Sequence, residues 1–457
     1  MSVKIQADEN DPNRILASPT KEFFIHMLTK DITLIDAISD LVDNCIDGAK
    51  RTRENENYTD LVININISHN SFQISDNCGG IPVDIARKYA FRFGRPEGMS
   101  RVDHSIGNFG VGMKRALFKI GSFFSIESKT RESFFVVEQD IGRWAEDPDK
   151  WDFRFKEVSE DLSNPVDECG TKIQVSELYS GISDEFSLEN FSTRLRYKLQ
   201  SFHQKSMEQG LSITLNSLPL AFEPAALLSS LELRPAFEQL EKEDGKVKVK
   251  IYTGISEREP KKAGWTVFCN GRLILEADKS FVTGWGRESG MPEYHNDYAR
   301  FRGYVFFDAD QSDLLPWNTT KSSVDSDSPL YRSIKLEMIK MMHPVVDFLR
   351  EVSKERSEQG NTDPTSLDLA INEAKPAKLS QLELAIEKNQ LSTESQLSQK
   401  VTFAAPTRKS LSPTEGRVQY SKPLSEIEKV KKSLNVTTLT AVGQGTFEYY
   451  LRMECES

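Results

Sequence analysis

The sequence predicts an α/β (α+β) protein with two consecutive domains and a mostly flexible C-terminal tail. Helical and strand-like periodicities alternate from about residue 20 to residue 177, and again in a different order up to about residue 356. After that point the composition turns polar, and only the last residues regain aromatic side chains. The predicted segments are two domains over 1–180 and 181–356, a polar linker over 357–423 and a small element over 424–457.

Composition and charge exclude several classes of protein. Apolar residues make up 38% of the 457 residues, and the formal net charge is −11. This charge argues against a surface that binds nucleic acid as a whole, although it leaves room for a local basic patch. The widely spaced cysteines contain no C-x-x-C pair, as expected for reduced thiols. Neither an apolar signal sequence nor a run of about 18 apolar residues occurs, so we expect a cytoplasmic protein without a membrane partner.

The first domain is expected to alternate helices and strands. The apolar residues of its first helix, over 33–50, recur at helical spacing, and Gly48 stands where a C-terminal cap belongs. The next two helices open at Pro82 and near Gly110, and the second of them ends by Gly121. The expected strands, rich in β-branched and aromatic residues, lie at 61–68, 71–76, 122–128, 133–139, 153–158 and 171–178.

The second domain is expected to begin with a helix over 188–207 and to end with a long helix over about 331–356. Several strands lie between these helices, and a loop over 314–325 precedes the long one. Within the polar linker one helix is expected around residues 379–391.

The first motif lies on the first helix and combines carboxylates with an asparagine. Asp40 and Asn44 are four residues apart and therefore share one face of the helix, while Asp43 and Asp47 extend its polar side. An Asn oxygen is a hard ligand suited to Mg²⁺, and a nearby carboxylate can orient a water molecule. Taken alone, a solvated acidic face of an amphipathic helix explains this pattern equally well.

The second motif, D-N-C-G-G-I at residues 76–81, directly follows a strand. A carboxylate at the end of a strand can accept a hydrogen bond from an adenine amino group. Two adjacent glycines let the backbone approach a flat base. By itself, an Asx turn between a strand and a helix is the simpler interpretation.

The third motif, G-N-F-G-V-G-M-K at residues 107–114, leads into a helix. Glycines there leave backbone N–H groups free to point at phosphates, the helix dipole favours negative charge, and Lys114 adds a positive one. The spacing fits neither a P-loop nor a dinucleotide-binding fingerprint. A glycine-rich helix start is a weak signal without the other two motifs.

In this order, the three motifs resemble the Bergerat ATP-binding fold of the gyrase, Hsp90, histidine kinase and MutL (GHKL) superfamily over residues 31–171. The resemblance implies a two-layer α/β sandwich that binds ATP and Mg²⁺, with an ATP lid over 94–109. It implies that Asn44 holds Mg²⁺ and phosphates, that Asp76 reads adenine, and that Thr171 supports Asp76. The other residues that it implies at the nucleotide are Asp47, Gly80, Ile81, Gly107, Gly110, Val111, Gly112, Met113 and Lys114.

Two residues depart from the family pattern. Asp40 stands where ATPases of the family usually have Glu, and we expect it to act as the general base although its side chain is one methylene shorter. Cys78 stands where the family usually has Gly, and Gly79 and Gly80 are expected to keep the turn possible.

A lysine of the second domain completes the expected site. Lys321, ahead of the long helix, is similar to the lysine that reaches the γ-phosphate from a transducer-type domain in the gyrase and MutL branches. The alternative is an ordinary lysine of a surface loop.

The whole chain resembles bacterial Hsp90-like or MORC-like ATP-binding proteins. This implies a Mg²⁺-dependent ATPase that acts as a slow conformational switch, forms a homodimer in the ATP state and works on DNA or on a protein client. A nucleotide-gated scaffold with little hydrolysis is the alternative, because Asp40 is short. A histidine-kinase-like phosphotransferase is a third. The excess of Lys and Arg over 400–432 fits a solvated linker better than a nucleic-acid site.

Overall fold

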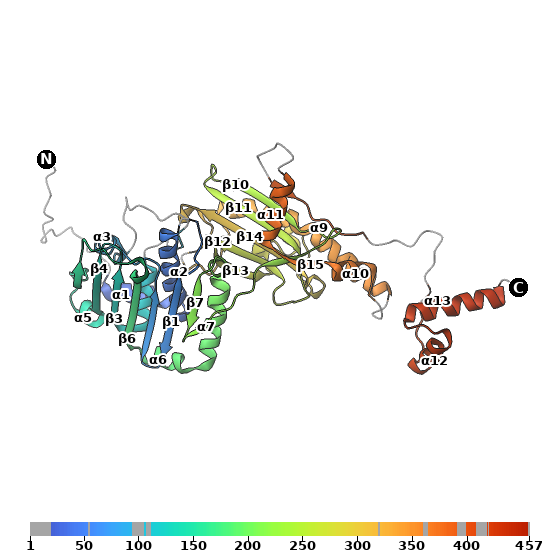
Figure 1. Cartoon of the computed structure of the whole chain (residues 1–457), viewed down its shortest axis with the longest axis horizontal. Coiled ribbons are helices and arrows are strands. Elements are labelled where there is room, and N and C mark those ends of the chain that lie inside the picture. Colours follow the sequence, from blue (N-terminus) through green and yellow to red (C-terminus); the bar gives the residue numbers. More distant parts are fainter. Residues whose placement is uncertain are drawn as a thin grey trace, which may run out of the picture. The chain divides into compact units, whose positions relative to one another are not determined.

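The computed structural model describes residues 20–53, 55–93, 105–106, 111–318, 320–359, 364–390, 399–407, 418 and 420–455. Contacts divide the chain into two compact units, Met1–Phe222 and Glu223–Ser457 (Figure 1). This boundary lies after the predicted one at residue 180. The reason is that strand β7 (Ser212–Leu215) pairs in parallel with β1 (Val62–Ser68) and so belongs to the first sheet.

The first unit is built on an eight-stranded sheet in the order β5-β4-β3-β6-β2-β1-β7-β8. Apart from the parallel β1–β7 pair, its neighbouring strands are antiparallel. The strands predicted for this domain are confirmed. The remaining bounds are β2 Ser71–Asp76, β3 Gly121–Lys129, β4 Phe134–Asp140, β5 Phe155–Ser159, β6 Gly170–Leu178 and β8 Leu218–Pro219.

Helices form a second layer against this sheet. Helix α4 packs on α2 and contacts β3 and β6, and Figure 1 shows α1 and α2 behind the strands. The arrangement confirms the predicted mixed α/β class. The helices are α1 Lys21–Lys30, α2 Leu34–Thr52, α3 Val83–Ile85, α4 Gly112–Ile120, α5 Ile141–Glu146, α6 Ser180–Ser187, α7 Glu189–Phe202 and α8 Gln204–Glu208. A π-helical turn η1 spans Ala86–Ala90, and a 3-10 turn η2 spans Val166–Glu168.

Several helix boundaries differ from the prediction, and the helix predicted to open at Pro82 is the short α3 followed by the π-helical turn η1. Gly48 does not end its helix, because α2 continues to Thr52. A Cβ at Gly48 would lie 2.9 Å from the carbonyl oxygen of Cys78, so glycine is needed there for close packing rather than for a cap. The helix predicted over 188–207 is interrupted at His203, which separates α7 from α8.

The second unit contains a six-stranded sheet in the order β13-β12-β14-β11-β10-β16 and a two-stranded sheet of β15 and β9. The long helix α9 (Pro329–Gln359) packs on β11 and β14, and the Thr253 hydroxyl donates to Met341 O across this contact. The strands are β9 Ala226–Ser229, β10 Ala236–Lys242, β11 Val247–Ile255, β12 Gly264–Cys269, β13 Arg272–Asp278, β14 Phe301–Ala309, β15 Lys375–Lys378 and β16 Gln399–Val401. Short 3-10 turns are η3 Phe281–Thr283, η4 Arg287–Ser289, η5 Asn296–Tyr298 and η6 Ser312–Leu314.

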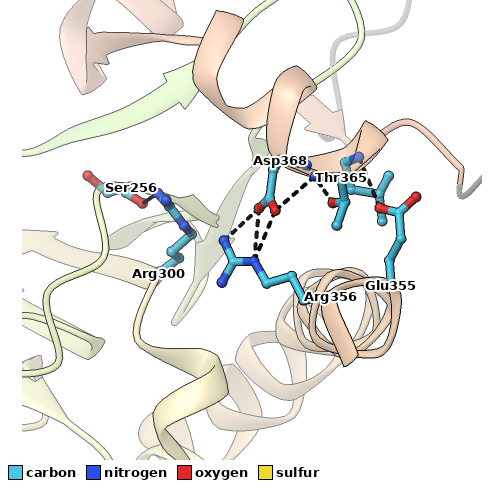
Figure 2. A network of polar contacts seen from close by, with 7 residues as sticks. Ser256, Arg300, Glu355, Arg356, Thr365 and Asp368 are labelled. Carbon is cyan, nitrogen blue, oxygen red and sulfur yellow. Dashed lines mark hydrogen bonds and ion pairs between the residues drawn. The ribbon is translucent and has the colours of Figure 1, made fainter. Parts of the chain in front are cut away.

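Residues 364–390 and 399–407 of the predicted linker contain helices and strands that belong to this unit, so the linker prediction is wrong there. Helix α10 (Ser366–Glu373) is tied to the end of α9, as Figure 2 shows. Arg356 donates to both carboxylate oxygens of Asp368, at 2.5 Å and 3.1 Å. Glu355 accepts from the Ser366 hydroxyl and from Leu367 N at the start of α10.

A small apolar cluster holds the following segment in place. Leu379, at the start of α11 (Leu379–Gln390), is buried with Leu227, Phe237 and Tyr252, and Val401 of β16 packs against them. Composition missed this segment because a few correctly spaced apolar residues were enough to fix it. The tail predicted to be mostly flexible also holds α12 Leu424–Leu434, α13 Leu439–Tyr450 and the π turn η7 Leu451–Cys455, none of which contains a buried residue.

Within the part of the chain that the structure describes, none of the helices combines the length and the apolar character needed to cross a membrane.

Candidate functional site

Helix α2 carries the first motif with most of its polar residues turned inward. Asp40, Asp43 and Asp47 are buried, whereas Asn44 is exposed. Burying a carboxylate is costly unless the carboxylate is paired or hydrogen-bonded. This burial excludes the solvated acidic face as an explanation of the motif, and it leaves the Asn44 amide accessible to a ligand.

Asp40 lies at the start of α4. The Arg115 guanidinium donates to Asp40 Oδ2 at 2.6 Å, and a Cβ at Gly112 would lie only 3.2 Å from the same oxygen. Val111, the residue before α4, makes no side-chain capping hydrogen bond to that helix. N–H groups at the start of a helix suit an anion. Gly107 and Gly110 lie outside the described residues, as does most of the predicted lid.

Two residues expected at the nucleotide, Asp47 and Lys114, contact protein backbone. Asp47 accepts a hydrogen bond from Ile106 N at 2.7 Å, and Lys114 Nζ donates to Ala90 O at 3.0 Å. Lys114 is only 2% exposed, and burial lowers the pKa of its ammonium to about 7. These contacts join the residues on either side of 94–104 to the helices of the site. Val111 and Met113 flank Gly112, Val111 half-buried and Met113 buried.

Asp76 ends β2 in a partly exposed position, with donors on several sides. Cys78 N donates to its Oδ1 at 2.8 Å, and the Cys45 thiol and the Thr171 backbone also hydrogen-bond to it. Burial raises the pKa of the Asp76 carboxyl, and these hydrogen bonds act in the opposite direction. Burial also raises the pKa of the Cys45 thiol, which therefore keeps the proton that it donates.

The turn after Asp76 is closely packed and needs its glycines. Gly79 and Gly80 have φ of 95° and 74°, a region that side chains disfavour. A Cβ at Gly80 would lie 2.2 Å from Lys129 O, and Arg51 donates to Gly80 O at 3.0 Å. The two glycines therefore keep the turn possible with Cys78 buried before it, as predicted.

A hydroxyl pair fixes the end of this turn. Ile81 N donates to Ser128 Oγ at 2.7 Å, and Ser128 Oγ lies 3.2 Å from Thr171 Oγ1. Thr171 is paired in register with Asp76 across β2 and β6. The predicted Asp76, Gly80, Ile81 and Thr171 thus meet in one place.

Sequence reasoning missed four residues of this site: Cys45, Arg51, Arg115 and Ser128. Cys45 and Arg115 are sequence neighbours of predicted site residues on amphipathic helices, so helical spacing offered a signal for them. Only strand pairing brings Ser128 to Thr171, and the sequence carries no signal for that.

Asp43, the residue before Asn44, makes a buried contact with a histidine. His203 Nδ1, at the break between α7 and α8, lies 3.6 Å from Asp43 Oδ1, and both side chains are buried. This contact connects the site helix α2 to α7, the last long helix before β7.

Lys321 belongs to the second unit. It is buried, has φ of 53° and donates its backbone N–H to Asn318 O at 3.0 Å. The ordinary surface loop lysine is therefore excluded, and its contact with a phosphate stays a prediction.

The residues present fit a magnesium nucleotide better than a metal held by protein alone. Among residues 20–455, apart from the undescribed gaps, no three His, Cys, Asp or Glu side chains cluster as metal ligands. Mg²⁺ usually keeps several waters and takes one or two protein ligands beside substrate phosphates. Asn44 presents an exposed amide that could bind Mg²⁺, and the start of α4, where Val111 makes no side-chain cap, could offer N–H groups to phosphates.

The comparison with protein families matches this geometry. Residues 32–171 match the family described as "Histidine kinase-, DNA gyrase B-, and HSP90-like ATPase", a span that runs from the start of α2 to Thr171. No curated protein matches the chain. Residues 32–171 therefore form an ATP-binding domain of the GHKL superfamily.

Proposed function

We propose that the protein is an ATP-driven conformational switch that hydrolyses ATP slowly with Mg²⁺. The observation that supports this most directly is the position of Asp40, which is held against Gly112 one helical turn from the exposed Asn44. An acid at the start of α4 and, one turn further along α2, an exposed amide suited to Mg²⁺ thus support a nucleotide site on these two helices of a GHKL domain. Phosphoryl transfer to water needs mainly positioning and charge stabilisation, which such a set supplies.

Each residue has a role in this proposal. Asp76 accepts a hydrogen bond from the adenine amino group, and Ser128 and Thr171 hold the turn beside it. Asn44 holds Mg²⁺, which when bound neutralises charge on the phosphates. Asp40 orients the attacking water and accepts its proton.

The remaining parts of the proposed switch are inferred from the resemblance to known ATPases alone. Lys321 would reach the γ-phosphate from the second unit, two chains would join in the ATP state, and the client would be DNA or another protein, as in Hsp90-like and MORC-like proteins. The fold alone does not decide the client.

A second candidate function, a nucleotide-gated scaffold with negligible hydrolysis, is favoured by one specific observation. Asp40 is only 4% exposed and is paired with Arg115. A carboxylate engaged in this way contacts water less readily than an exposed one.

Steady-state ATP hydrolysis and calorimetric ATP binding test these alternatives in the wild type, Asp40→Asn and Asn44→Ala, each with and without duplex DNA. Asp184→Asn, on the exposed side of α6, is the matched control. Hydrolysis that is lost in both site variants and kept in the control supports the switch. Binding without hydrolysis in the wild type supports the scaffold, and an absence of ATP binding refutes both.

A further inference from the structure

Arg115 and Asp40 form a deeply buried Arg–carboxylate pair. Their side chains are 8% and 4% exposed, and Nη2 of Arg115 lies 2.6 Å from Oδ2 of Asp40. Removing two charges from water costs free energy that their attraction often only offsets, so a buried pair is weak evidence of a stabilising role. The position of the pair in the fold is therefore a better guide to its role than its contribution to stability.

The pair joins the two helices on which the nucleotide site is built. Asp40 belongs to α2, one turn before Asn44, and Arg115 lies in the first turn of α4, three residues after Gly112. Residues three apart on a helix lie on the same side. The carboxylate therefore packs between Arg115 and Gly112, within 3.2 Å of where a Cβ at Gly112 would be.

The protein does not fully satisfy the Arg115 guanidinium. Its Nε is buried and has no acceptor among the residues that the structure describes. A planar guanidinium that donates to a carboxylate oxygen fixes that oxygen, and because the carboxylate is rigid it also fixes the direction of the other oxygen. A short aspartate is thereby held in one orientation at the start of α4.

We propose that Arg115 is a positioning residue that orients Asp40 for hydrolysis of ATP. This inference rests on the proposed function, in which Asp40 directs the water. Arg115 acts through Asp40 and not on the nucleotide, so its loss should lower kcat and leave ATP affinity nearly unchanged. Lys retains the charge and one donor but not the planar geometry, and should restore part of the rate.

The test compares kcat, KM and the calorimetric Kd for ATP in Arg115→Met, Arg115→Lys, Asp40→Asn and the Asp40→Asn/Arg115→Met double variant. Arg87→Met is the matched control, because Arg87 forms an exposed ion pair with Glu160 in the same unit. For Arg115→Met we expect kcat to fall about 10- to 100-fold, since a small misplacement of a reacting group costs this much. The Kd for ATP should stay within about threefold, and Arg115→Lys should recover several-fold of the lost rate.

The double variant decides whether Arg115 acts through Asp40. In the Asp40→Asn background, Arg115→Met should change kcat by less than about twofold, because the carboxylate to be positioned is gone. This variant also leaves no unpaired buried charge, so it keeps the test valid if Arg115→Met alone does not fold.

Three outcomes would overturn this inference while leaving the proposed hydrolysis in place. Arg115→Met with wild-type kcat would show that no positioning is needed. A Kd weakened as much as kcat would make Arg115 a phosphate ligand, and rate losses that multiply in the double variant would make it independent of Asp40. A wild type that binds ATP but does not hydrolyse it would overturn the proposed hydrolysis together with this role, whereas the first three outcomes leave hydrolysis standing.

Discussion

Replacing Lys114 by Met is expected to stabilise the protein, with a gain that shrinks as the pH rises. Burial lowers the pKa of the Lys114 ammonium from 10.5 to about 7. The Nζ atom donates to Ala90 O and lies 6.0 Å from the ring centre of Phe93. Met has a similar length, adapts to irregular apolar surroundings and carries no charge that must be desolvated.

The lowered pKa of Lys114 sets an upper limit to the gain in the free energy of unfolding. One pKa unit corresponds to about 1.4 kcal/mol, so a pKa lowered from 10.5 to about 7 amounts to about 5 kcal/mol. Below pH 7 the folded and the unfolded chain both bind the proton, and the wild type bears the full cost of burying the charge. Between about pH 7 and 10.5 only the unfolded chain keeps the proton, so the stability of the wild type rises with pH by up to about 1.4 kcal/mol per unit.

The expected gain is smaller than this limit because the variant loses a hydrogen bond. That loss costs about 1 kcal/mol, and relaxation around the ammonium lowers its burial cost further. We therefore expect Lys114→Met to raise the free energy of unfolding by about 2 to 3 kcal/mol near pH 6 and by close to zero near pH 9.

Urea unfolding across this pH range measures the difference between the variant and the wild type. Hydrogen exchange of peptides from α4 assigns the change to the first unit. Lys88→Met, at an exposed position of η1, is the control and should show no comparable pH dependence. A difference that stays constant from about pH 6 to 9, or a variant less stable at every pH, would refute the reasoning.

Three further substitutions test other parts of the structure. Gly80→Ala should destabilise the first unit by more than about 2 kcal/mol and abolish calorimetric ATP binding, because its Cβ would lie 2.2 Å from a backbone oxygen; Gly181→Ala, whose Cβ meets nothing within 4 Å, should bind as the wild type does. Ser128→Ala removes the acceptor of a turn N–H and should weaken the Kd for ATP about tenfold while leaving kcat nearly unchanged; an unchanged Kd would remove Ser128 from the site. Arg356→Met releases Asp368 and should speed hydrogen exchange of α10 about fivefold, the effect of about 1 kcal/mol for a partly exposed pair; unchanged exchange would show that α10 is held by its apolar residues alone.

Local patterns predicted much of the first unit. Strands β1 to β6 of the first sheet and the helix that carries Asn44 follow from residue periodicity, which depends on the spacing of apolar side chains. The glycines before Ile81 also follow from local backbone geometry. The order of the three motifs then pointed to the family that residues 32–171 match.

Composition was a poorer guide to the region after α9. The polar stretch read as a linker contains α10, β15, α11 and β16, because a few buried residues such as Leu367 and Leu379 dock them on the second unit. The average polarity of a segment does not reveal single buried residues of this kind. It does not reveal the Arg356–Asp368 contact either.

The sequence by itself determined which residue types are expected at the nucleotide and in what order they come, because those types must suit adenine, phosphate and Mg²⁺ in any such site. Only the tertiary structure decided how each residue is used, because contacts between distant segments depend on packing. In the folded chain, Lys114 and Asp47 form hydrogen bonds with backbone groups. Arg115 contacts Asp40, and Ser128 contacts Thr171. Periodicity places a residue on a face of its own element, but not against its partner on another.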